Sequence, residues 1–379
     1  MKRNILISQP VLGDEEWNAM KQPLETGWVT QGPLVKEFED EFARKHEVKH
    51  ALACTSATTA LHLSLVALNI KQGDEVIVPS FTWIATANVV LYCGARPILV
   101  DIDTSTFNMD PNDVAAKITK KTKAIIAVHL FGLCADMDLI RECAGDIPII
   151  EDAACAAGAK YKDKFAGGLG VLGCFSFHPR KSITTGEGGM VTTNDDALAD
   201  KINMLRNHGA SISEEQRHHG PRPYILADFN ILGFNYRMTD LQGAVGTIQL
   251  KKLNQFIEER NKWASFYNEQ FRDIEWINTP VVPDDCRHGW QSYVVMIDEN
   301  KSPHTRNKIM ELLQDKGIST RPGTHAVHML NFYSDKYSIS PDEFPSSVLA
   351  NNCSIAIPLH NKMTEEDYEY VAAHIKDIT

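Results

Sequence analysis

The residues best suited to chemistry lie in segment 175–189, which reads Phe-Ser-Phe-His-Pro-Arg-Lys-Ser-Ile-Thr-Thr-Gly-Glu-Gly-Gly. Lys181 stands just before a glycine turn and just after a short predicted strand that carries Ser176. A lysine amine can condense with an aldehyde, and a serine hydroxyl can bind a phosphate group. A lone lysine in a turn is usually a surface residue, but Ser176 and the glycines around Lys181 favour a functional role. The segment therefore predicts a site for a phosphorylated aldehyde.

A second segment supplies a carboxylate at the end of a predicted buried strand. Asp152 ends the run Ile-Ile-Glu-Asp at 149–152. A carboxylate favours the protonated form of a nearby ring nitrogen, and strand ends in parallel sheets line ligand crevices. A capping or structural aspartate is the simpler alternative. Lysine and carboxylate together meet the minimum needs of pyridoxal 5'-phosphate (PLP), with pyridoxamine 5'-phosphate as its aminated form. Lys181 and Asp152 are the predicted catalytic residues.

The sequence also offers candidate residues for binding the phosphate and the ring of such a cofactor. Its phosphate requires backbone N–H groups at a helix N-terminus and small hydroxyl side chains, for which Ala57, Thr58 and Ser176 are available. Thr58 alone would be read as a helix cap. Its ring requires a flat apolar surface, which Trp83 can offer in competition with Phe81.

These residues must be positioned by a regular framework, and the chain alternates short β-rich runs with helical stretches. The predicted strands are 75–79, 97–101, 124–130, 147–151, 174–177 and 189–193. The predicted helices are 35–45, 56–65, 239–272 and 305–316, with a further strand at 293–297 and a long polar loop at 209–228. Apolar strands that alternate with helices predict an α/β fold with a mostly parallel sheet covered on both faces.

The length and composition limit the possible classes of protein. A chain of 379 residues exceeds the usual size of one core. We therefore expect an N-terminal arm and large domain at 1–250 and a smaller C-terminal α/β domain at 251–379. A net charge of −11 argues against nucleic-acid binding. Eight scattered cysteines without a Cys-x-x-Cys pair predict reduced thiols and no metal site. No apolar run is long enough for a signal peptide or a membrane span, so the protein is expected in the cytoplasm.

Seven motifs in a fixed order resemble the DegT/DnrJ/EryC1/StrS family of PLP-dependent nucleotide-sugar aminotransferases. They occur at residues 27–33, 56–61, 79–83, 151–154, 176–189, 233–238 and 317–328. The resemblance implies the aspartate-aminotransferase fold (PLP fold type I), in a homodimer with each active site at the subunit interface. It assigns covalent attachment of PLP to Lys181, the ring-nitrogen partner to Asp152 and the stacking aromatic to Trp83.

The same resemblance assigns residues that local chemistry alone would not. Asn235 matches the position that reaches the phosphate from the neighbouring subunit; without the family it would be read as a loop turn. Positions near the sugar or its diphosphate are Trp28, Thr30, Arg237, His325 and His328.

The chain departs from the family pattern at two positions. Ala57 stands where glycine is common, which can alter the turn near the phosphate. Cys155 stands where glutamine, histidine or another polar residue is common, and a thiol is a poor hydrogen-bonding substitute. The 3-dehydratase relatives carry histidine in place of the lysine, so Lys181 argues against that class.

The resemblance implies transfer of an amino group from L-glutamate, through pyridoxamine 5'-phosphate, to a nucleotide-linked keto-sugar. A 4-keto-6-deoxyhexose is the first expectation and a 3-keto-sugar the second, for surface-polysaccharide or glycan precursors such as O-antigen. A ketocyclitol is an alternative acceptor. A PLP-binding regulator and a fold-type-I enzyme of other chemistry are the alternatives from other classes. The net negative charge and the Lys181/Asp152 pair argue against a regulator. The ordered motifs argue against a fold-type-I enzyme of other chemistry.

Overall fold

The fold is built around a seven-stranded sheet, seen in a computed structural model that describes residues 3–212, 224 and 226–378. In spatial order the strands are β1 (His50–Cys54), β10 (Gly189–Thr193), β9 (Leu172–Ser176), β6 (Ile149–Asp152), β5 (Thr122–Val128), β2 (Glu75–Pro79) and β4 (Arg96–Val100). β10 is antiparallel to both of its neighbours, and the other adjacent pairs are parallel. The predicted mostly parallel α/β sheet is confirmed.

Helices cover both faces of this sheet because its strands are apolar on both faces. On β2, Ile77 faces one core, whereas Val76 and Val78 face the other. The Ile77 side is covered by α3 (Pro33–Lys45), α6 (Pro111–Lys117), α7 (Met137–Ala144) and part of α10 (Asp240–Phe271). The opposite side is covered by α4 (Ala57–Ala67), α5 (Ala85–Tyr92) and α8 (Asp196–Arg206).

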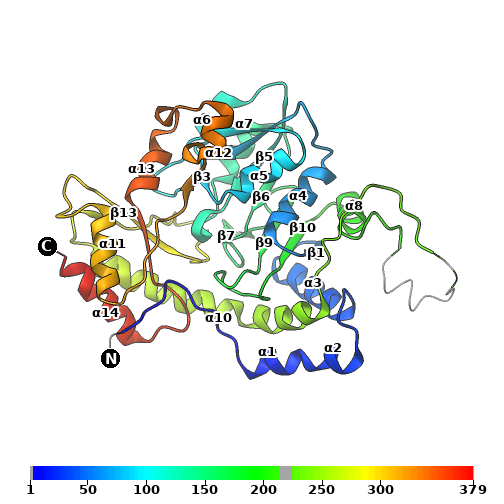
Figure 1. Cartoon of the computed structure of the whole chain (residues 1–379), viewed down its shortest axis with the longest axis horizontal. Helices are drawn as coiled ribbons and strands as arrows, with labels where there is room; N and C mark the ends of the chain where they lie inside the picture. Colours follow the sequence, from blue (N-terminus) through cyan, green and yellow to red (C-terminus); the bar gives the residue numbers. More distant parts are fainter. Residues whose placement is uncertain (1–2, 213–223, 225, 379) are drawn as a thin grey trace.

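The 32-residue helix α10 joins the large sheet to the C-terminal elements and runs along one side of the molecule (Figure 1). It begins after Thr239, whose hydroxyl accepts from the Gln242 N–H in a capping box. Leu250 and Leu253 pack in the core of the large sheet, while Tyr267 and Phe271 pack in the C-terminal core. The expected domain boundary at residue 250 falls inside this helix, and the two-domain division stays a prediction.

The C-terminal part has its own antiparallel sheet of β11 (Ile277–Asn278), β13 (Tyr293–Ile297) and β15 (Ser354–Ile357). It packs with α11 (Arg306–Asp315) and α14 (Glu365–Lys376). The N-terminal arm joins this part, because Ile5 pairs with Ile318 in a short β-bridge. A further two-stranded pair, β3 (Phe81–Thr82) with β14 (His325–Ala326), connects the C-terminal segment to the large domain.

The remaining elements of the described residues are smaller. They are α1 (Asp14–Ala19), α2 (Lys21–Thr26), β7 (Lys160–Tyr161), β8 (Lys164–Phe165), β12 (Cys286–Arg287), α12 (Asn331–Tyr337) and α13 (Pro345–Cys353), with three short 3-10 turns at Leu130–Gly132, Val327–Met329 and Pro341–Glu343. Within the described ranges, no helix combines the length and apolarity needed to cross a membrane.

The predicted elements differ from the structure mainly at their ends. The strand predicted at 124–130 is Thr122–Val128, and the helix predicted at 239–272 is Asp240–Phe271. Strand β1 was missed, because its sequence His-Ala-Leu-Ala-Cys is short and carries no turn signal. The loop predicted at 209–228 lies largely outside the described residues, which omit 213–223 and 225.

Buried neutral histidines should make the cofactor-free protein sensitive to acid. His46 stacks on Phe42 at 4.0 Å and accepts from the Gly158 N–H, and burial lowers its pKa to about 4. Burial also lowers the pKa of His360 to about 4 and that of His288 to about 3. A depressed folded-state pKa stabilises the protein above the unfolded value near 6.5, and that stability is lost as the pH falls toward 4.

We therefore expect the melting temperature to fall between pH 7 and pH 4.5, with His46 alone contributing about 3 kcal/mol once the pH approaches 4. His46→Gln should flatten this dependence. His208→Asn, at an exposed histidine, should leave it unchanged. An equal slope in wild type and His46→Gln would contradict the assignment.

Candidate active site

Lys181 lies in a tight turn that follows β9. The Lys181 N–H donates to the His178 carbonyl, and the Phe177 N–H donates to the Gly188 carbonyl at 2.9 Å, which closes the loop around the lysine. The Lys181 Nζ donates to the Cys155 Sγ at 3.1 Å. Cys155, noted as a departure from the family pattern, therefore contacts the amine directly.

Asp152 is the last residue of β6 and is almost fully buried, with 6% of its surface exposed. Its carboxylate accepts from the Thr86 hydroxyl at 2.8 Å and from the Ala154 N–H at 3.2 Å. Burial raises the pKa of Asp152, although the charge of Lys181 and both hydrogen bonds oppose that effect. A cation facing this carboxylate, such as a protonated ring nitrogen, would favour its ionised form.

Neighbouring Glu151 has a structural role that the sequence did not reveal. Successive residues of a strand face opposite sides, so Glu151 points away from Asp152. Its fully buried carboxylate accepts from the N–H groups of Gly167, Leu169 and Gly170 at 2.6–2.7 Å and from His129 Nε2 at 2.9 Å. These bonds fix the end of β6, and with it Asp152. The only sequence signal was two consecutive carboxylates in an otherwise apolar run.

The N-terminus of α4 forms a cradle for an anion. The Ser56 hydroxyl caps the helix by accepting from the Thr59 N–H, and the Ala57 and Thr58 N–H groups have no acceptor among the described residues. Ser176 lies close by, because β9 places it opposite Gly189 and a Cβ on Gly189 would lie 2.3 Å from the Ser56 carbonyl carbon. Free N–H groups and a hydroxyl suit a phosphate.

The close approach of Gly189 to the backbone of Ser56 and Ala57 predicts that a side chain at residue 189 would disturb the cradle. In Gly189→Ala, the new methyl group would overlap backbone atoms of Ser56 and Ala57, so the start of α4 must move. We expect PLP affinity to fall at least about tenfold, which corresponds to loss of one good hydrogen bond to a charged group. A fluorescence titration of the cofactor-free protein measures it. Gly13→Ala, where a Cβ meets nothing within 4 Å, is the matched control and should bind normally.

Trp83 lies at the exit of β3 with 60% of its surface exposed, so a ring face is available for stacking. The His325 ring lies 5.7 Å from it, because β3 pairs with β14. Thr82 and Thr86 share a hydroxyl contact of 3.2 Å, and Thr86 binds Asp152. A chain of contacts thus connects the aromatic to the carboxylate. The competing candidate, Phe81, is fully buried in the core.

The family resemblance assigns Asn235 to the phosphate site of a partner and assigns Arg237 and Thr30 to the sugar or its diphosphate. Asn235 is exposed and pairs with Asn207, whose side chain also accepts from Arg237 at 2.7 Å. Their assigned roles stay predictions. Thr30 is exposed in the loop before α3, and its carbonyl accepts from the N–H of Asp240 at the start of α10.

Trp28 and His328 differ in exposure. The Trp28 indole N–H donates to the Gln31 carbonyl at 3.3 Å in the same loop, and the residue is half-buried. His328 is 1% exposed and packs against Phe344, and neither ring nitrogen has a hydrogen-bond partner among the described residues. Direct contact between a sugar and His328 would require this segment to open, whereas His325 is already exposed.

These groups fit the predicted cofactor. Lys181 would bind it covalently, Asp152 would face the ring nitrogen, Trp83 would cover the ring, and Ala57, Thr58 and Ser176 would hold the phosphate. When bound, PLP supplies a ring that withdraws electrons from the substrate carbon. The raised pKa of Asp152 and the two free N–H groups of α4 are the observations that support the fit.

Known proteins resemble the whole chain. The model of the DegT/DnrJ/EryC1/StrS aminotransferase family matches residues 10–376. GDP-perosamine synthase from Caulobacter vibrioides is 40% identical over 378 residues, covering 99% of this chain and 98% of that protein. Spore coat polysaccharide biosynthesis protein SpsC from Bacillus subtilis is 37% identical over 382 residues, covering 100% of this chain and 98% of that protein.

A solved structure shows the same architecture. The PLP form of the putative sugar aminotransferase Spr1654 from Streptococcus pneumoniae superposes with a TM-score of 0.91 at 26% identity, covering 99% of this chain and 98% of that one. Fold type I is thus confirmed, as is PLP as the cofactor. The chain belongs to the DegT/DnrJ/EryC1/StrS aminotransferase family and is a PLP-dependent aminotransferase.

Proposed function

We propose that this aminotransferase moves an amino group from L-glutamate to a nucleotide-linked keto-sugar in the cytoplasm, making a precursor of a surface polysaccharide. The 40% identity to GDP-perosamine synthase across nearly the whole chain carries this proposal. Similarity to a protein named for spore coat polysaccharide biosynthesis supports the same use. A 4-keto-6-deoxyhexose is the proposed acceptor, with a 4-amino sugar nucleotide as the product.

Within the site, the proton transfers of such a reaction belong to Lys181. With PLP and an amino donor bound, a free Lys181 amine would serve as the base that removes and returns a proton at the reacting carbon. Cys155 is positioned to hold the free amine between these transfers. Asp152 would favour a protonated ring nitrogen, and its burial would strengthen this effect because competing water is excluded.

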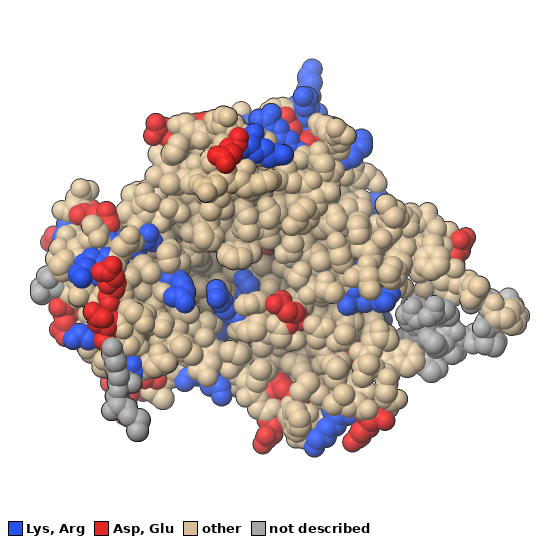
Figure 2. All heavy atoms as spheres, viewed as in Figure 1, with Lys and Arg blue, Asp and Glu red and all other residues tan. Residues whose placement is uncertain are grey.

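The diphosphate of the acceptor needs cationic partners. The chain as a whole is acidic, with a net charge of −11, yet the face in Figure 2 is hollowed near its centre and carries Lys and Arg side chains, together with an acidic group, along the lower edge of the hollow. Forked guanidinium groups such as that of Arg237 suit phosphate oxygens. Exposed His325, beside Trp83, is placed to meet the sugar.

We also propose a homodimer in which Asn235 completes the phosphate site of the neighbouring subunit. Asn235 is exposed, and near it in sequence Leu226, Phe229 and Leu232 have 84%, 60% and 89% of their surfaces exposed. Large exposed apolar side chains in one segment favour an interface. Light scattering should give a mass near twice 42.3 kDa; a monomer that binds PLP normally would contradict the proposal.

The function is tested by incubating the purified enzyme with L-glutamate and a panel of ketones, followed by mass spectrometry of the products. The panel contains GDP- and UDP-linked 4-keto-6-deoxyhexoses, a nucleotide-linked 3-keto-sugar and a free ketocyclitol. We expect amination of a 4-keto compound and formation of 2-oxoglutarate. Reaction only with the 3-keto-sugar or only with the cyclitol would replace the proposed acceptor. Omission of glutamate is the control.

A further inference from the structure

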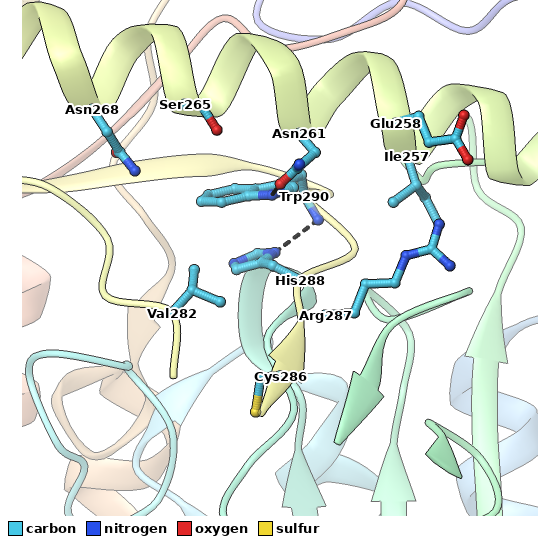
Figure 3. Close-up of a pocket in the computed structure, with 10 residues that line it drawn as sticks. All are labelled: Ile257, Glu258, Asn261, Ser265, Asn268, Val282, Cys286, Arg287, His288 and Trp290. Atoms are coloured by element: carbon cyan, nitrogen blue, oxygen red, sulfur yellow. Dashed lines mark hydrogen bonds between the residues drawn. The ribbon is translucent and has the colours of Figure 1, made fainter. Parts of the chain in front are cut away.

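A separate cavity of about 370 Å³ lies beneath the C-terminal half of α10. Its floor is formed by the rings of His288 and Trp290, which stack at 3.8 Å with an interplanar angle of 9° (Figure 3). Lys181, Asp152 and Trp83 are not among the residues that line it. Ligand pockets usually measure roughly 300–1,000 Å³, so this one suits a hexose-sized metabolite and is too small for a nucleotide sugar.

One wall of the cavity is a polar face of α10, on which Asn261 and Ser265 are exposed, so the cavity opens to solvent. Asn261, Ser265 and Asn268 are spaced by four and three residues, which places them on one side of the helix, and they point toward the stacked rings (Figure 3). The Asn261 Oδ1 accepts from the Trp290 Nε1 at 3.1 Å, and the Asn268 Oδ1 accepts from the Tyr293 hydroxyl at 2.6 Å. With both amide oxygens occupied, the amide N–H groups remain as donors.

Two opposite charges line the same cavity without neutralising each other. Glu258 on α10 and Arg287 on β12 lie at one end of it (Figure 3). In the part of the chain that the structure describes, neither makes an ion pair within 4.0 Å. An ammonium group would pair with Glu258, and a carboxylate or phosphate with Arg287. The cavity therefore has the complementary charges for one small zwitterion.

The floor of the cavity connects to the lysine loop of the active site. Trp290 adopts a left-handed backbone conformation, with φ of +46°, which is strained for a residue with a bulky side chain. Its carbonyl accepts from the buried Arg260 Nη1 at 3.2 Å, and the same nitrogen donates to the hydroxyl of Ser182 at 3.2 Å. Ser182 follows Lys181 directly. Movement of Trp290 would thus reach the catalytic turn through Arg260.

From these contacts we propose that the cavity is a second binding site, which takes a small zwitterionic metabolite and transmits its occupancy through Trp290 and Arg260 to the Lys181 loop. The shared chemistry of its ligands is one ammonium group, one oxyanion and neighbouring hydroxyl groups. An amino-sugar phosphate and a free hydroxy amino acid such as serine both have that chemistry. This inference concerns regulation and does not depend on which ketone the enzyme aminates.

Isothermal titration calorimetry on the PLP-loaded enzyme tests the binding. The probes are glucosamine 6-phosphate, glucosamine, glucose 6-phosphate and L-serine. We expect glucosamine 6-phosphate to bind at least about tenfold more tightly than the two sugars that lack one charge, since a charge-assisted hydrogen bond is lost with each. Tighter binding of L-serine would identify an amino acid as the source. Equal affinity for all four probes, or no binding, would overturn the proposal.

Two variants on α10 separate this site from the active site. Ser265→Phe places a ring in the lining of the cavity, where Ser265 is exposed, and should abolish binding, whereas Asn254→Phe introduces the same ring at an exposed position outside the lining and should not. Binding that survives in Ser265→Phe would place the ligand elsewhere and overturn the assignment. Coupling to the Lys181 loop is tested by titrating the visible absorbance band of bound PLP with pH. Saturating ligand should shift the midpoint of this titration in wild type and not in Ser265→Phe. An unshifted midpoint in the ligand-bound wild type would overturn the coupling.

Discussion

Replacing Lys181 with alanine is expected to reduce turnover by about a thousandfold or more. The roles proposed for the amine are covalent attachment of the cofactor and proton transfer, and loss of a positioned acid–base group alone typically costs 10²–10⁴ in rate. The visible absorbance band of the lysine-bound cofactor should disappear, and borohydride should no longer attach PLP to the protein. Absorbance, mass spectrometry of the reduced protein and steady-state rates measure the three effects.

The fold should survive this change, because the described contact of the Lys181 Nζ is the single hydrogen bond to Cys155. Lys164→Ala, at the preceding lysine of the chain, is the matched control and should retain full activity, since Lys164 is exposed on the short strand β8. Lys181→Arg keeps a cation in place but cannot condense with an aldehyde at neutral pH. PLP should therefore bind to it reversibly. Normal steady-state turnover in either variant of Lys181 would contradict the assignment.

The sequence predicted the parts of the site that depend on local order. As expected from local sequence, Asp152 ends β6, Ser176 ends β9, and Lys181 lies in the turn that follows. The helix cap at Ser56 followed from a local rule as well. Parallel strands bring their carboxyl ends to one edge of the sheet, and the structure accordingly places the predicted catalytic residues near enough for their charges to interact.

Other parts of the site depend on contacts between distant segments, and these could not be read from the sequence. Thr86 binds Asp152 across 66 positions, and nothing around Thr86 distinguishes it from other helical threonines. His325 and His328 belong to one motif, but pairing of β14 with β3 exposes the first beside Trp83 and buries the second against Phe344. The role proposed for Asn235 involves a neighbouring subunit, and no local pattern around residue 235 indicates it.

Asp152→Asn should lower kcat by about a hundredfold while preserving the shape of the site. Asparagine can still accept from the Thr86 hydroxyl, but it no longer favours a proton on the ring nitrogen of the cofactor. A hydrogen bond between charged groups contributes roughly 1.5–3 kcal/mol, which corresponds to a factor of about 10–100 for the anchored charge alone. Steady-state kinetics with glutamate and the preferred ketone measure the effect, and Thr86→Val, which removes one hydrogen bond and no charge, should have a smaller one.

The same substitution should change stability in the opposite sense when no cofactor is bound. Burial raises the pKa of Asp152 above its ordinary value of 3.8, so the folded protein holds this proton more tightly than the unfolded chain. That preference destabilises the folded state as the pH rises through the folded-state pKa, and asparagine removes it. The melting temperature of cofactor-free Asp152→Asn relative to wild type should therefore be higher at pH 7 than at pH 4. Parallel pH profiles would show that the buried carboxylate carries no such cost, and they would contradict its proposed role as the partner of a cationic ring.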